Sequence, residues 1–234
     1  MLYSMNMKEK MFAWAVHAYT SLGLVTGLFA LRATMEGEMG FAFFWLAMSV
    51  IIDATDGPLA RRFHSAEVLP GFNGRTLDDI VDYLNYVFVP AFILVRAGLL
   101  SSWGWALIPL VSSAYGFSRK DAKTPDGYFT GFPSYWNVIA LYLYLFKQSS
   151  SLNALIVTVF GILVFIPVHY IDPFKTSPLR RITVPLTIAW GLAILSVIAL
   201  MPDPPPPLVH ASFAYVCYYM LASFWTGLKR AKRE

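Results

Sequence analysis

The sequence predicts an all-α integral membrane protein with about eight transmembrane helices and both termini in the cytoplasm. Of its 234 residues, 57% are hydrophobic and only 14% are charged, whereas a soluble domain carries about 25% charged residues. The mean hydropathy is +0.55, and apolar runs close to the roughly twenty residues that cross a bilayer recur along the chain. No polar block is large enough for a separate domain, so residues 1–234 are expected to form a single transmembrane domain.

Eight segments have the length and composition of spanning helices. They are separated by polar or turn-forming stretches such as Glu36-Gly37-Glu38 and the proline run at 204–207. The predicted spans are 12–33, 40–62, 77–98, 101–118, 132–147, 152–171, 182–201 and 207–228.

The distribution of Lys and Arg sets the predicted orientation. An even number of spans puts both termini on one side, and cytoplasmic loops usually hold an excess of basic residues. With the termini inside, 15 of the 18 basic residues are cytoplasmic, and only Arg32, Arg96 and Lys147 are outside. The net charge of +4 is therefore explained by topology and by anionic lipid headgroups, and we expect no binding of nucleic acid.

Ionisable side chains are costly within a membrane, yet the second and third predicted spans contain several aspartates. Asp53 and Asp56 are three residues apart, and Asp78 and Asp82 are four apart, so each pair lies on one face of its helix. If the two faces meet, they form a box of four carboxylates. Mg²⁺ and Mn²⁺ prefer such oxygen ligands and often also hold the phosphates of a substrate.

A structural alternative is that these acids form ion pairs with Arg61, Arg62 and Arg75. The surrounding residues also suit a phosphate ligand, because Arg61 can bind a phosphate bidentately. Small residues on the same helices would let a ligand approach the backbone closely. These are Gly57, Ala60 and Gly74.

The pattern Asp53-x2-Asp56-Gly57-x2-Ala60-Arg61, followed by Gly74-x3-Asp78-x3-Asp82, resembles the signature of the CDP-alcohol phosphotransferases. The signature occupies residues 53–82. A long spacer between its halves, and eight spans instead of the usual six, resemble the bacterial phosphatidylcholine synthases within that family. The segment 115–137 and the pattern His17-x2-Thr20-x2-Gly23 are similar to those synthases as well.

This resemblance implies roles for individual residues. It implies two ions, Mn²⁺ or Mg²⁺, bound by Asp53, Asp56, Asp78 and Asp82, with Asp82 also acting as general base. It implies transfer of the phosphatidyl group of CDP-diacylglycerol to choline, with release of CMP, by a homodimer in a bacterial inner membrane with its active site at the cytoplasmic face. The residues expected to bind the CDP moiety are Thr20, Gly57, Ala60, Arg61 and Gly74.

Choline carries a quaternary ammonium, which proteins bind with aromatic ring faces. Tyr83 and Tyr86 follow the last aspartate of the signature, and Tyr135 and Trp136 open the fifth predicted span. These four residues are the candidate choline ligands.

Two other interpretations remain open. The acceptor could be serine, as in a phosphatidylserine synthase, or the alcohol of another CDP-alcohol phosphotransferase; a serine carboxylate would need a cation such as Arg119 or Lys120. A cation transporter or channel would also carry intramembrane acids. Against it, the acids cluster at one cytoplasmic level, and only His210 offers a titratable acid or histidine in the outer half of the spans.

Overall fold

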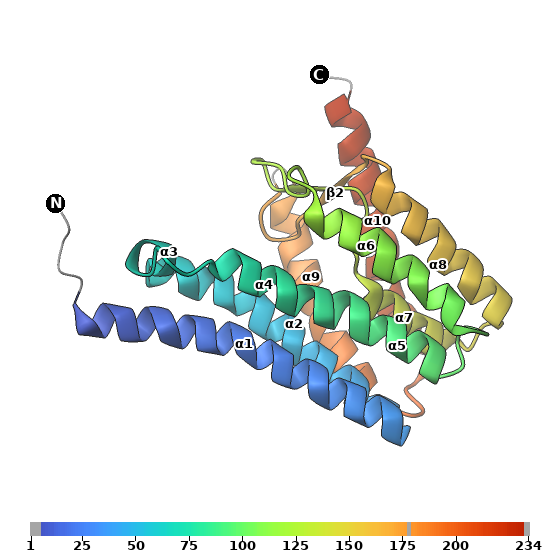
Figure 1. Cartoon of the computed structure of the whole chain (residues 1–234). Helices are drawn as coiled ribbons and strands as arrows, with labels where there is room; N and C mark the ends of the chain where they lie inside the picture. Colours follow the sequence, from blue (N-terminus) through green and yellow to red (C-terminus); the bar gives the residue numbers. More distant parts are fainter. Residues whose placement is uncertain (1–5, 177–178, 232–234) are drawn as a thin grey trace.

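The structure, a computed structural model, describes residues 6–176 and 179–231, and most of them are helical (Figure 1). The chain ends 1–5 and 232–234, predicted to be cytoplasmic, lie outside the described residues, as do residues 177–178 of the last predicted cytoplasmic loop. The helices are α1 (Met7–Glu36), α2 (Met39–Arg62), α3 (Ser65–Val68), α4 (Gly74–Asp82), the π-helix η1 (Tyr83–Phe88), α5 (Val89–Arg96), the 3₁₀-helix η2 (Trp103–Ala106), α6 (Leu107–Ser118), α7 (Trp136–Phe146), α8 (Ser150–Phe165), α9 (Arg180–Ala199) and α10 (Pro206–Ala231).

The prediction of a helical membrane protein is confirmed in its coarse form. Within the described ranges, four helices are long and apolar enough to cross a bilayer, namely α1, α2, α9 and the Pro206–Gly227 part of α10. The helices α7 and α8 are apolar but have only 11 and 16 residues. The third predicted span is built from α4, η1 and α5, which follow one another as a continuous rod (Figure 1).

Two predicted spans have other limits than the helices of the structure, and a short two-stranded sheet accompanies the helices. The helix predicted at 132–147 begins only at Trp136, and the one predicted at 152–171 ends at Phe165. Residues His169–Ile171 form strand β2 instead. It pairs antiparallel with strand β1 (Tyr128–Thr130), with Phe129 opposite Tyr170.

Local backbone chemistry explains both corrections. Gly131 has φ of +82°, a left-handed conformation that favours glycine, and its amide donates to the Val168 carbonyl at 2.8 Å. Pro133 and Pro167 disfavour the helical conformation for the residues that precede them. The apolar run therefore continues in the sequence, but its backbone leaves the helix.

Close backbone approach holds α1 against the rod that carries the third-span aspartates. A Cβ at Gly27 would lie 2.9 Å from Asn85 Oδ1, and the Asn85 side-chain amide donates to the Gly23 carbonyl at 2.9 Å. Asn85 is 1% exposed. Glycine at these two positions thus fixes the distance between α1 and η1.

The small sheet is anchored to the last helix. The Ile171 amide donates to Ser223 Oγ at 3.2 Å, and the Tyr219 hydroxyl donates to the Ile171 carbonyl at 3.0 Å. Ser223 and Tyr219 both lie on α10. Tyr170, which precedes Ile171 in the strand, is fully buried. This contact holds the following residue, Asp172, and Tyr219 near each other although they are far apart in the sequence.

Candidate active site: an aspartate cluster beside a group of tyrosines

Three aspartates from two helices converge. Asp53 of α2 and Asp78 and Asp82 of α4 each place one carboxylate oxygen within 4.8 Å of the other two. Asp78 and Asp82 share a face of α4 because they are four residues apart. Their meeting with Asp53 confirms that the aspartate-bearing faces of the two helices are apposed.

No basic side chain neutralises this cluster by direct contact in the described part of the chain. None of the ion pairs found there, at a limit of 4.0 Å, includes Asp53, Asp78 or Asp82. The structural alternative, pairing with nearby arginines, therefore has no contact to support it. Three partly buried carboxylates held together in this way form the hard oxygen donor set that fits Mg²⁺ or Mn²⁺.

Asp56 lies apart from this group of three. Its side chain is 5% exposed, and its Oδ2 accepts a hydrogen bond from Thr20 Oγ1 at 2.8 Å. The sequence predicted one box of four carboxylates, whereas the structure draws three together and holds the fourth against α1. Thr20, expected at the nucleotide, is the residue that holds it.

Tyrosine side chains continue from the aspartate cluster. The Tyr86 hydroxyl donates to Asp53 Oδ2 at 2.7 Å. The Tyr86 and Tyr135 rings have centroids 6.2 Å apart, and the Tyr135 and Tyr219 rings are 6.0 Å apart. Tyr86 lies in the π-helical turn η1, a type of turn that is frequent at functional sites. We refer to Tyr86, Tyr135 and Tyr219 as the tyrosine group.

The other two predicted aromatic ligands have different surroundings. Trp136 is fully buried, and its indole nitrogen donates to Ser113 Oγ at 2.7 Å, so it offers no open ring face. The Tyr83 hydroxyl donates to the Leu110 carbonyl at 2.7 Å, and its ring packs edge-on against Phe117. Both rings pack against α6 in the described structure.

Four residues near the cluster were not predicted as ligand candidates from the sequence. Lys123 lies close enough to Asp53, Asp78 and Asp82 to interact electrostatically with all three. The chain segment that follows the sheet contributes an ion pair of Lys175 Nζ with Asp172 Oδ2 at 3.4 Å, and both partners act on Asp53. Lys123 lies in the segment 115–137 that resembles the synthases, whereas no pattern in the sequence pairs Asp172, Lys175 or Tyr219 with the signature. The four residues are Lys123, Asp172, Lys175 and Tyr219.

Arg119 is already paired within its own loop. Its Nε and Nη2 donate to the two oxygens of Asp121 at 2.9 and 2.6 Å. The hydrogen bond from Arg119 lowers the pKa of the Asp121 carboxyl, so the pair is charged at neutral pH. The guanidinium that a serine carboxylate would need is thus engaged.

The small residues of the signature have distinct environments. A Cβ at Gly57 would meet only Arg61 Nη1, at 3.4 Å, so the exposed guanidinium lies over an open patch of α2. Ala60, on the same helix, is partly exposed. Gly74 instead packs on the His17 ring, where a Cβ would lie 2.5 Å from Cε1. Gly57 leaves room for a ligand, whereas Gly74 makes room for a side chain of α1.

A largely helical chain, with apolar helices of membrane-spanning length and an all-oxygen aspartate cluster, has the features of an integral membrane protein with a site suited to divalent metal. The model of the family described as CDP-alcohol phosphatidyltransferase matches residues 16–167. The chain belongs to this family and is a transferase.

Curated relatives are similar over most of their length. A phosphatidylcholine synthase of Legionella pneumophila is 37% identical over 91% of this chain and 88% of its own. One of Pseudomonas aeruginosa is 33% identical over 97% and 96% of the two chains. One of Borreliella burgdorferi is 38% identical over 75% and 76%. The similarity therefore extends beyond the signature.

Proposed function

We propose that this chain transfers the phosphatidyl group of CDP-diacylglycerol to choline and releases CMP, as a phosphatidylcholine synthase does. The observation that carries the proposal is the hydrogen bond from Tyr86 to Asp53, because it joins the aspartate cluster to the tyrosine group. A site for phosphates and a site suited to a quaternary ammonium are thereby adjacent. The names of the relatives agree with this combination.

The metal ligands in this proposal are Asp53, Asp78 and Asp82, with Asp56 one turn further along α2, for two ions of Mg²⁺ or Mn²⁺. When bound, divalent metal neutralises the charge of the diphosphate and of the departing CMP. Arg61 supports the same phosphates from the open patch over Gly57. Gly57 and Ala60 border the CDP moiety directly. Thr20 and Gly74 act on it indirectly, through Asp56 and His17.

Asp82 is the general base. Its carboxylate takes the proton of the choline hydroxyl, whose oxygen then forms a bond to the phosphorus that carries diacylglycerol. The bond from that phosphorus to the oxygen of CMP breaks, and CMP leaves with the electron pair. Asp82 suits this role because it directly precedes the turn that carries Tyr86, so it lies between the phosphates and the acceptor.

Choline recognition is assigned to the tyrosine group. Three rings at centroid distances of 6.0 and 6.2 Å present faces and edges around one region, and Asp172 adds a negative charge that acts on Tyr135. A trimethylammonium group donates no hydrogen bond, so ring faces and a nearby carboxylate are its natural partners. Tyr83 of η1 and Trp136 of α7 support this region through their hydrogen bonds to α6.

The acceptor is tested by measuring CMP release from the purified protein with CDP-diacylglycerol and one alcohol at a time. We expect release with choline and little with serine, since Arg119 is engaged by Asp121. Inositol and glycerol 3-phosphate should also give little, because neither carries a cation for the tyrosine group. Release with serine but not choline would identify a phosphatidylserine synthase. A transporter would release CMP with none of them.

We also propose that the chain crosses the bacterial inner membrane eight times, with both termini and the aspartate cluster at the cytoplasmic side, and that it forms a homodimer. The support is the excess of Lys and Arg in the loops assigned to the cytoplasm. In a Cys217→Ser background, Ala122→Cys should react with an impermeant thiol reagent only from the cytoplasmic side. Labelling from outside would contradict the orientation.

The homodimer is tested by measuring the mass of the purified protein in detergent.

A further inference from the structure

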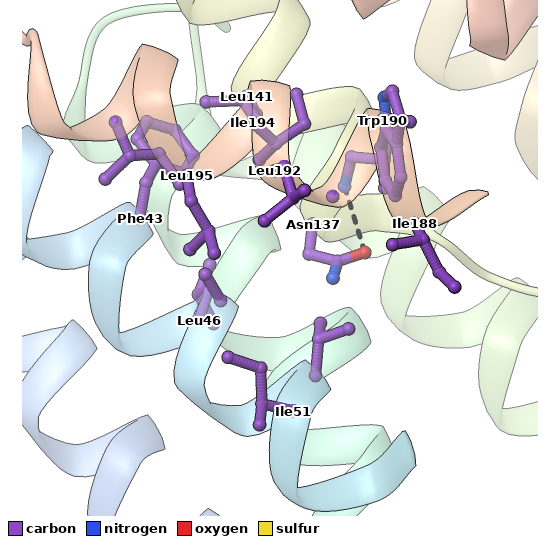
Figure 2. Close-up of a pocket in the computed structure, with 15 residues that line it drawn as sticks. Phe43, Leu46, Ile51, Asn137, Leu141, Ile188, Trp190, Leu192, Ile194 and Leu195 are labelled. Atoms are coloured by element: carbon purple, nitrogen blue, oxygen red, sulfur yellow. Dashed lines mark hydrogen bonds between the residues drawn. The ribbon is translucent and has the colours of Figure 1, made fainter. Parts of the chain in front are cut away.

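An apolar groove lies between α2, α7 and α9, outside the aspartate cluster (Figure 2). Its volume is about 280 Å³, and fourteen of its fifteen lining residues are apolar or glycine. The exception is Asn137, near the start of α7. One wall of the groove, α9, lies beyond residues 16–167, the region that the family model matches.

The groove points toward the aspartate cluster along α2. Leu46 and Val50 line it, and Asp53 follows them by seven and three residues, so all three lie on one face of the helix. The α2 lining runs from Phe43 to Ile51, a helical length of about 12 Å at ~1.5 Å per residue. A ligand in the groove along this face is therefore directed toward Asp53, the carboxylate that accepts a hydrogen bond from Tyr86.

The polar residue, Asn137, lies toward the cluster, because it follows Tyr135 of the tyrosine group by two residues. Figure 2 shows Phe43 and Leu195 toward one end of the groove and Asn137 and Ile188 toward the other. Asn137 Oδ1 accepts a hydrogen bond from the Val138 amide at 2.9 Å, drawn as the dashed line. No hydrogen bond from its Nδ2 is found among the described residues, so this donor is available to a ligand.

We propose that this groove holds an acyl chain of the CDP-diacylglycerol substrate and that Asn137 donates to the ester carbonyl of that chain. The inference rests on the proposed function, which requires a lipid donor at the aspartate cluster. An acyl ester has the matching pattern: a long apolar tail, then one acceptor, then the glycerol that leads to the diphosphate. A helix of a second copy of this chain would fill the groove but would not require a donor at the cluster end.

The groove can be filled without disturbing its walls. A Cβ added at Gly191 of α9 meets nothing within 4 Å, so Gly191→Phe should place its ring in the space that the acyl chain occupies. Ala189→Phe is the matched control, because Ala189 is exposed on the same helix and is not part of the lining.

The experiment measures CMP release with CDP-diacylglycerol carrying either sixteen-carbon or six-carbon chains. For Gly191→Phe we expect the ratio of kcat/KM for the long-chain donor to that for the short-chain donor to fall about tenfold, since the buried methylenes contribute most for the long chain. The KM for choline should stay the same. Ala189→Phe should keep the wild-type ratio. A donor with a photoreactive group near the chain end should label α9 in the wild-type protein.

An unchanged ratio in an active Gly191→Phe protein, or photolabelling away from α2, α7 and α9, would overturn the groove assignment while leaving the proposed reaction intact. Wild-type protein that releases no CMP with choline would contradict the proposed function instead. If it used another alcohol, the chain-length ratio would be measured with that alcohol. Photolabelling in the wild type decides the groove even if Gly191→Phe does not fold.

Discussion

Asp82→Asn should slow CMP release by roughly 10²- to 10⁴-fold, the usual effect of losing a general base. Asparagine keeps the shape of the side chain and one oxygen near Asp53 and Asp78, but it cannot accept the proton of the acceptor hydroxyl. The loss should appear in kcat at saturating Mg²⁺ or Mn²⁺ and should persist as more metal is added. Asp79→Asn is the matched control, since Asp79 neighbours Asp78 but lies outside the cluster.

Asp53→Asn separates metal binding from proton transfer. This substitution should also weaken activity, but because the proposal makes Asp53 a metal ligand, raising the metal concentration should restore part of the rate. A chelator should abolish activity in the wild type, and added Mg²⁺ or Mn²⁺ should return it. Near-normal turnover of Asp82→Asn at saturating metal would remove Asp82 from the role of base.

Tyr135→Leu should raise the KM for choline by about 30-fold, which corresponds to ~2 kcal/mol for a cation–π contact away from water. Tyr135 is the best choice within the tyrosine group, because its ring lies between the other two and Tyr86 also binds Asp53. The KM for CDP-diacylglycerol should change little.

Tyr135→Phe is the control, because it keeps the ring and removes only the hydroxyl. It should bind choline much better than Tyr135→Leu. Equal losses in the two variants would show that the hydroxyl and not the ring face matters, and the assignment of choline to the tyrosine group would then fail. Initial rates at several choline concentrations with saturating lipid donor distinguish these outcomes.

Within one helix, the sequence was a good guide to the site. A spacing of three or four residues puts side chains on one helical face whatever surrounds the helix, so the pairing of Asp78 with Asp82 follows from the sequence alone. The cost of placing acids among apolar residues also marked them as candidate site residues. Their meeting with Asp53 followed as an expectation and is confirmed.

Contacts between distant segments were less accessible to prediction. Trp136 directly follows Tyr135, yet one is fully buried against Ser113 and the other joins the tyrosine group. The direction of each ring depends on which helix packs beside it, and nothing in the local sequence specifies that neighbour. Asp56 was separated from the cluster for the same reason, by its hydrogen bond to Thr20 of α1.

The sequence by itself determined the membrane class, the approximate positions of the helices and the aspartate signature, because hydropathy and helical period are properties of contiguous residues. Only the tertiary structure decided that α10 contributes Tyr219, that a two-stranded sheet holds Asp172 nearby, and that α9 closes an apolar groove beside α2. These features join residues far apart in the chain, and their contacts exist only once the helices have packed.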